Sequence, residues 1–400
     1  MNSKTRMIVF AVLGLILFAG AIYGVAMTAP ASSALASDTT VYDNNSIDEN
    51  FKFLKNIGIW FMLMLVAFLM MFIRKFEWSV LLATLLSAAT SFVGYLAIQQ
   101  FIFGEAWNQT LMIAGVVCAI TLVIAIGVFL GTIKMWQYPI LGLLFAPVYV
   151  LMELFMGGSI FGLGYATDPG GSILVHMGAA YFGLGVALAI REKKAFGEPM
   201  YTTTHSVGFV WLAAMLLWML WPTFVTAFLP PEQVFWGIMT CYMAGVGSII
   251  AAYVVCQVVE KKVNPLVYAY AMLAGPVAIG APLLIVGAWG ALVVGILAGA
   301  LSALSFLFIH PWLCKKLGVL DVMGVHNLHG IPGWLGGIIA AVVVGSFVNI
   351  VAAFVIMFGT IIAGLIIGTI LKLSRGVMPE GEAFMNDDND FIKSEKPADA

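Results

Sequence analysis

Long apolar segments constrain the fold of this 400-residue chain more than any other feature. Hydrophobic residues make up 62% of the chain, charged residues only 10%, and the mean hydropathy is +1.04, a composition incompatible with a soluble globular protein. Each segment is long enough for an α-helix to cross a bilayer, and none shows the alternation of a barrel strand. We therefore predict an all-α polytopic membrane protein with eleven transmembrane helices, at approximately 53–73, 79–103, 108–132, 138–160, 171–190, 206–229, 233–257, 266–284, 286–309, 323–346 and 349–371.

The distribution of basic residues predicts the orientation. Lysine and arginine follow the first, third, fifth, seventh, ninth and eleventh segments, whereas the intervening loops contain neither. Basic loops usually face the cytoplasm. We expect an integral protein of the plasma (inner) membrane, with its mature N-terminus outside and its C-terminus in the cytoplasm.

The two ends of the chain differ from the apolar region. Lys4 and Arg6 precede an apolar run that ends in small residues, which predicts a signal peptide over residues 1–36. An uncleaved extra helix is the alternative, because the run is long enough to span a bilayer. Residues 37–375 then form a single transmembrane domain. Residues 376–400 predict an acidic cytoplasmic tail, disordered or loosely docked, to which a regulatory protein could bind, although no motif supports such a partner.

The number of segments indicates an internal repeat. Eleven segments divide into five, five and one, and a repeat with an odd number of helices must be inverted in the membrane. We predict inverted repeats over about 52–192 and 205–347, followed by a peripheral helix at about 349–371. The fifth and tenth segments each begin with an aspartate, then a histidine, then a glycine-rich stretch.

Histidines in these two segments are candidate pore residues, because ionisable groups at membrane depth are costly and usually functional. We predict that His176 and His326 meet near the bilayer midplane, where neutral imidazoles can donate and accept hydrogen bonds without fixed charge. The alternative for each ring is a contact between helices. His329, one turn after His326, either lines the same pathway or bonds to the backbone.

Three carboxylates accompany the histidines. Asp168 and Asp321 each precede a predicted helix, where a carboxylate can accept free backbone N–H groups. Asp168 would also attract cations to an outer vestibule. Glu153 lies within an apolar run and is predicted to face protein or the vestibule, since its charge would be costly in lipid.

Several of these stretches resemble one known family. Asp168-Pro-Gly-Gly with His176, Trp221-Pro-Thr-Phe224, and above all the stretch from Asp321 through His-Asn-Leu-His-Gly-Ile-Pro-Gly resemble the ammonium transporter and Rhesus glycoprotein superfamily, in its Rhesus branch as found in bacteria. The resemblance implies a homotrimer in the membrane lipid with one pore per subunit, twin histidines at His176 and His326, and a vestibule aspartate at Asp168.

The resemblance also implies a gate of two stacked phenylalanines. Phe224 matches the inner one. The outer position falls at Val116 or Val117, so this sequence departs from the pattern, and Phe92 is a candidate to fill the space.

The function implied is an ammonium/ammonia channel that recruits ammonium at the vestibule, deprotonates it and conducts neutral ammonia. Methylamine and carbon dioxide are further small solutes that a dry pore would admit. The alternative is a proton-coupled, electrogenic secondary transporter of ammonium or another small cation. We predict no enzymatic activity, no cofactor and no bound metal, because no ligand spacing is recognisable. The absence of a basic patch argues against nucleic-acid binding.

Overall fold

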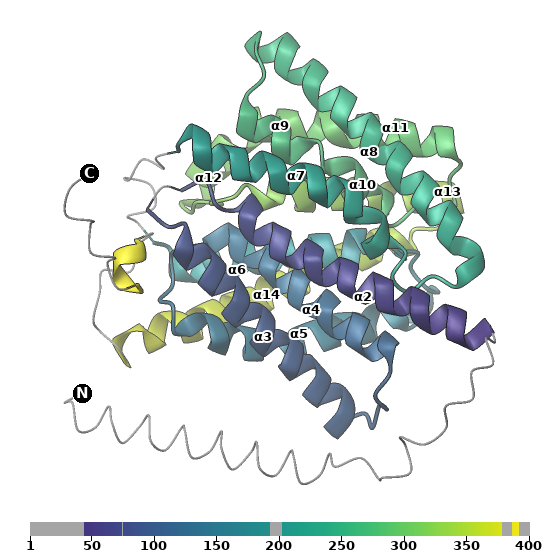
Figure 1. Cartoon of the computed structure of the whole chain (residues 1–400), viewed down its shortest axis with the longest axis horizontal. Helices are drawn as coiled ribbons and strands as arrows, with labels where there is room; N and C mark the ends of the chain where they lie inside the picture. The colour runs from purple at the N-terminus through teal and green to yellow at the C-terminus, as the bar shows by residue number, and fades with distance from the viewer. Residues whose placement is uncertain (1–43, 74, 193–201, 378–385, 392–400) are drawn as a thin grey trace.

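The computed structural model describes residues 44–73, 75–192, 202–377 and 386–391, which form helices and no strand (Figure 1). Ten helices in this part of the chain are long and apolar enough to cross a membrane. The eighth predicted segment forms two short helices instead. The predicted signal peptide lies outside the described residues.

The helices follow the predicted order. In the first half they are α2 (Asn44–Leu69), α3 (Trp78–Phe101), α4 (Gln109–Phe129), α5 (Gln137–Gly157), and the π-helical turn η3 (Ser172–Met177) that continues into α6 (Gly178–Ile190). In the second half they are α7 (Thr204–Val225), α8 (Pro231–Glu260), α9 (Pro265–Ala271), α10 (Ala274–Ile279), α11 (Ala288–Leu304), the π turn η5 (Ser305–Ile309), α12 (His310–Leu317), and the π turn η6 (His326–Gly330) that continues into α13 (Ile331–Val344). Helix α14 (Val348–Ser374) follows.

The same packing pattern occurs in both halves, which supports the five-plus-five repeat. Helix α3 packs against α5 as α8 packs against α11, and α4 packs against α6 as α10 packs against α13. The halves meet where α2 packs against α7, and α14 lies along α6. In Figure 1 the first half, purple to blue, lies below the teal and green second half.

A proline explains the break in the eighth segment. Pro276 has no N–H group and its ring conflicts with the carbonyl four positions earlier, that of Met272. This carbonyl instead accepts a hydrogen bond of 2.6 Å from the Ser248 hydroxyl. The chain turns there between α9 and α10, and the freed backbone group remains satisfied inside the protein.

Helix α4 forms the centre of the protein. Of the residues in its apolar stretch, 94% are buried inside the protein. This burial explains why the helix is apolar on all sides rather than along one stripe. Residues of α4 that border a cavity therefore border an interior space rather than lipid.

Two glycines fix the loop before η3 against the end of α10. The Gly170 N–H donates to the Gly280 carbonyl over 2.8 Å, and a Cβ atom on Gly280 would lie 2.7 Å from the Gly170 oxygen. The Ser172 hydroxyl joins the same elements by donating to the Val277 carbonyl over 2.7 Å. The close contact between Gly170 and Gly280 therefore fixes the position of the loop that carries Asp168.

Part of the acidic tail is docked on the start of α3. The Asp387 carboxylate accepts backbone N–H groups of Glu77, Trp78 and Ser79 over 2.8–3.3 Å, and its own N–H donates to the Lys75 carbonyl over 2.7 Å. The Phe391 ring contacts the Trp78 ring edge to face, with centroids 5.5 Å apart. The tail thus supplies an N-terminal cap, with a favourable negative charge, to a helix about 300 positions earlier.

An Asp387→Ala variant should release this contact. Since a lost cap costs about 1 kcal/mol and an ionised cap more, the amides at the start of α3 should exchange with deuterium about tenfold faster. Mass spectrometry of peptides covering residues 75–82 measures this rate. The control is Glu260→Ala, which removes an exposed carboxylate at the end of α8; equal exchange in both variants would show that the tail does not cap α3.

Candidate solute pathway

Three interior cavities follow helix α4 from one face of the molecule to the other. Val117 borders the first, Ile120 and Ile124 the second, and Val128 the third. This spacing of three and four residues places them on one face of α4. The first cavity contains Asp168 and the third contains Asp321, so we name the two ends of the path the Asp168 face and the Asp321 face.

The cavity at the Asp168 face is a vestibule. The space open to the centre of a water-sized molecule is about 190 Å³, and both Asp168 and Glu153 border it. Glu153 accepts a hydrogen bond of 2.8 Å from the Tyr95 hydroxyl. Two carboxylates at one mouth favour cations there.

Asp168 belongs both to the vestibule and to the start of η3. Its Oδ2 accepts the backbone N–H groups of Ile173 and Leu174 over 3.0 and 2.8 Å, as a helix cap does. Its Oδ1 is buried and has no hydrogen-bond partner among the described residues. Burial raises the pKa of Asp168 to about 7, although the N–H groups of Leu174, Ile173 and Ser172 act to lower it.

The raised pKa predicts that stability depends on pH. The folded state binds this proton more tightly than the unfolded chain, whose carboxyl has the ordinary pKa of 3.8. The stabilisation that comes from protonated Asp168 is fully present below about pH 4 and is lost as the pH rises through about 7. We expect the Tm in detergent to fall over this range, and Asp168→Asn, which cannot titrate, to reduce the fall. Identical pH profiles for both proteins would contradict this prediction.

Phe224 separates the vestibule from the second cavity, because it borders both. Val117 also borders the vestibule, at the position where the resemblance implies an outer phenylalanine. Phe92 does not fill that space. It borders neither cavity, and its ring packs against Trp60 with centroids 5.1 Å apart. Phe224 is thus the phenylalanine that borders both cavities, whereas Phe228 borders the vestibule only.

The second cavity is a narrow, largely apolar chamber that contains two histidines. The Nδ1 atoms of His176 and His329 lie 3.1 Å apart, within hydrogen-bond distance, and their rings stack with centroids 5.1 Å apart. The space open to the centre of a water-sized molecule is about 20 Å³, enough for about one such molecule. The other lining residues are apolar or aromatic: Met62, Val66, Leu69, Ile120, Ile124, Leu217, Trp221, Phe224, Leu273 and Leu328.

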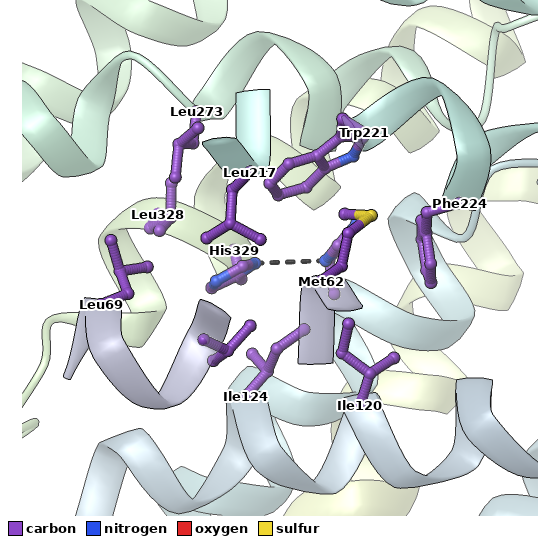
Figure 2. A pocket seen from close by; sticks show the side chains of 12 residues that line it. Met62, Leu69, Ile120, Ile124, Leu217, Trp221, Phe224, Leu273, Leu328 and His329 are labelled. Atoms are coloured by element: carbon purple, nitrogen blue, oxygen red, sulfur yellow. Dashed lines mark hydrogen bonds between the residues drawn. The ribbon is translucent and has the colours of Figure 1, made fainter. Parts of the chain in front are cut away.

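Figure 2 shows how the chamber is closed. Phe224 lies at one end, and Leu69, Leu273 and Leu328 lie at the other, with the histidine hydrogen bond between them. The Nε2 atom of His176 is buried without a hydrogen-bond partner among the described residues. A polar solute in the chamber would therefore find an unsatisfied nitrogen on an otherwise apolar wall.

The predicted pairing of His176 with His326 is wrong, and His329 is the partner. His326 begins the π turn η6 and is directed toward α6, where its Nε2 lies 3.4 Å from the Tyr181 hydroxyl. The sequence contained a signal that identifies the correct residue. His329 follows Asp321 by eight positions, as His176 follows Asp168, whereas His326 follows Asp321 by only five.

Asp321 occupies the corresponding position in the second half. Its two carboxylate oxygens accept the N–H groups of Val325 and His326, each over 2.9 Å. This buried aspartate therefore caps η6 as Asp168 caps η3, and the two caps present the chamber histidines from opposite faces. Burial also raises the pKa of Asp321.

Sequence reasoning missed most of the chamber wall. Trp221, whose ring centroid lies 5.6 Å from that of His176, was recognised only as part of a motif. Met62 and Leu217 were not singled out, because an apolar residue that faces a pore has the same sequence signature as one that faces a neighbouring helix.

Fold and pathway together define a polytopic membrane protein with a narrow interior route for a small solute. The chain belongs to the Ammonium Transporter Family, which matches residues 15–392, a family of transporters rather than enzymes. Bovine "Ammonium transporter Rh type A" is 31% identical over 342 residues, which cover 80% of this chain and 78% of the relative. Rat "Ammonium transporter Rh type C" is 30% identical over 286 residues, which cover 69% of this chain and 57% of the relative, and these Rh-type relatives place the chain in the Rhesus branch.

Solved structures agree with this assignment. The structure titled "Nitrosomonas europaea Rh50 and mechanism of conduction by Rhesus protein family of channels" matches with a TM-score of 0.83 and 34% identity, over 88% of this chain and 94% of that one. Candida albicans Mep2 matches with a TM-score of 0.67 and 16% identity, over 86% and 87% of the two chains. At that identity, the second match shows only a shared fold.

Proposed function

We propose that this protein is an ammonia channel of Rhesus type, which receives ammonium at the vestibule, releases its proton there and conducts neutral ammonia past His176 and His329. The observation that carries the proposal is the chamber itself. Its polar groups are almost entirely two mutually hydrogen-bonded imidazoles, and it has room for one molecule the size of water or ammonia.

Desolvation decides which form of the solute passes. An ammonium ion would have to leave its hydration shell for a cavity with no carboxylate among its lining residues, which is very costly for a charge. Ammonia loses only hydrogen bonds to water, and the imidazole nitrogens can replace some of these. The chamber therefore favours the neutral molecule.

The vestibule supplies the step before the chamber. Asp168 and Glu153 stabilise a cation at the mouth, and the free Oδ1 of Asp168 is an available acceptor for a proton or an N–H group. Phe224 then limits entry of water into the chamber, as hydrophobic constrictions do by dewetting. Methylamine and carbon dioxide are candidate additional substrates because both are small and have neutral forms.

The setting in the cell belongs to the same proposal. Basic loops at the Asp321 face favour a cytoplasmic position for that face, with the vestibule on the outer side of the plasma (inner) membrane. The exposed apolar side chains of the long helices would contact lipid or other subunits, as expected of the homotrimer that the sequence resemblance implies.

Flux into liposomes tests the function. Vesicles of low ammonia permeability, loaded with a pH indicator and mixed rapidly with ammonium chloride, should become alkaline faster when they contain the protein than when they are empty. The same vesicles exposed to methylammonium and to carbon dioxide define the selectivity. Equal rates with and without protein would reject the proposed function.

A further inference from the structure

The third cavity lies beyond the histidine chamber at the Asp321 face, and His326 borders it. Val128 of α4 marks its position, eleven residues after Val117 of the vestibule, which corresponds to about 16 Å along the helix axis. Ala180 and Leu184, one and two turns after His176 on the continuation of η3, border it from the other side. Both elements that line the pathway thus continue from the chamber to this cavity.

We assign the proton of the neutral His326 ring from its contact with Tyr181, whose O–H group needs a hydrogen-bond acceptor. His326 Nε2, 3.4 Å away, is the acceptor that the described residues offer to the tyrosine O–H. When Nε2 of a neutral imidazole accepts, the proton is on Nδ1.

That Nδ1 atom is buried and has no hydrogen-bond partner among the described residues. A buried donor without a partner costs about 1–3 kcal/mol unless another molecule satisfies it. The open space in the adjacent cavity is about 10 Å³, close to the minimum for one water-sized molecule. The remaining walls are largely apolar apart from Asp321, each of whose carboxylate oxygens accepts one backbone N–H group.

We propose that His326 forms a second solute site on the pathway, in which its Nδ1–H donates to the lone pair of a neutral acceptor molecule. Under the proposed function, on which this identification of the ligand rests, that molecule is ammonia on its way from the chamber to the cytoplasm. An ammonium ion has no lone pair and cannot accept this hydrogen bond. This hydrogen bond therefore favours the neutral form, as the chamber does.

Two substitutions of His326 test the roles of its two ring nitrogens separately. In His326→Asn the amide N–H lies near the position of Nδ1–H, so the donor is retained and the contact with Tyr181 is lost. In His326→Gln the amide reaches toward Tyr181, so that contact is retained and the donor to the cavity is lost. We expect the Asn variant to conduct ammonia within about twofold of wild type and the Gln variant about three- to tenfold more slowly, which is the effect of one lost neutral hydrogen bond.

A binding measurement on the wild type accompanies the flux. In detergent-solubilised protein with ¹⁵N-labelled histidine, the Nδ1 resonance of His326, identified by its absence from the Gln variant, should shift saturably with ammonia at a pH where ammonia is largely unprotonated. Ammonium at low pH should leave it unshifted.

The outcomes distinguish this inference from the proposed function. If wild type conducts ammonia but the resonance does not shift and the Gln variant conducts as fast as wild type, the second site is refuted and the channel function stands. If the resonance shifts while wild type fails to conduct ammonia, the site is supported and the channel function is refuted.

Discussion

A His329→Leu variant should conduct ammonia at least about tenfold more slowly than wild type. Leucine fills part of the space but removes the imidazole that can exchange a hydrogen bond with the solute. It also leaves His176 Nδ1 without its hydrogen-bond partner, which lies 3.1 Å away in the wild type. A tenfold change corresponds to about 1.4 kcal/mol, a modest loss for unsatisfied polar groups in a dry cavity. Alkalinisation of proteoliposomes that contain equal amounts of folded protein measures the effect.

His205→Leu is the matched control, because His205 is exposed at the start of α7 and far along the chain from the chamber. It should conduct at the wild-type rate. A His329→Leu variant that also conducts at the wild-type rate would remove the basis for assigning His329 to the pathway.

A Gly280→Ala variant should lose about 3 kcal/mol of stability and most of its conductance. The added methyl group would lie 2.7 Å from the Gly170 carbonyl oxygen and 2.9 Å from the Ser172 hydroxyl, and overpacking against backbone is costly. The Gly170 loop would have to move, and with it Asp168 and the start of η3. The Tm and the monodisperse yield in detergent measure the first effect, and liposome flux the second.

Gly290→Ala is the control for this change. Gly290 lies on the exposed side of α11, where a Cβ atom meets only Val286 at 3.5 Å; alanine there should be neutral or slightly stabilising, since glycine disfavours helix. If Gly280→Ala had the same Tm and flux as Gly290→Ala, the contact between Gly170 and Gly280 would not be what positions Asp168.

The helical architecture followed from the sequence because lipid imposes a strong rule. A bilayer requires long apolar helices with internally satisfied backbone groups, so hydropathy alone located nearly every segment. The break at Met272 was not predicted. It depends on Pro276 and on the Ser248 hydroxyl that accommodates the freed carbonyl, and the sequence displays only the proline.

The functional site could be predicted from the sequence less completely than the fold. Asp168, Glu153 and Phe224 were placed at a vestibule or its inner end, and His176 in the pore, because charge or family motif marked them. The choice of His326 over His329 failed because order along the chain does not determine the direction of a side chain, and a π turn changes the angular step between residues. The equal Asp-to-His spacing in the two halves would have corrected it.

The residue at the outer gate could not be identified without the tertiary structure. Phe92 was a reasonable candidate by residue type, but its ring is held by Trp60 on α2, and no feature of α3 alone records that contact. Val117 remains at the position and borders the vestibule together with Phe224.

The proposed mechanism requires the molecule that passes His176 and His329 to be uncharged. Measuring the uptake of ¹⁵N-labelled ammonia together with electrical current, in the same reconstituted membranes after an ammonium jump, tests it most directly. Passage of neutral ammonia should give protein-dependent uptake with no protein-dependent current at any voltage. A current that carries a positive charge with each nitrogen taken up would contradict it and would favour a proton-coupled, electrogenic transporter.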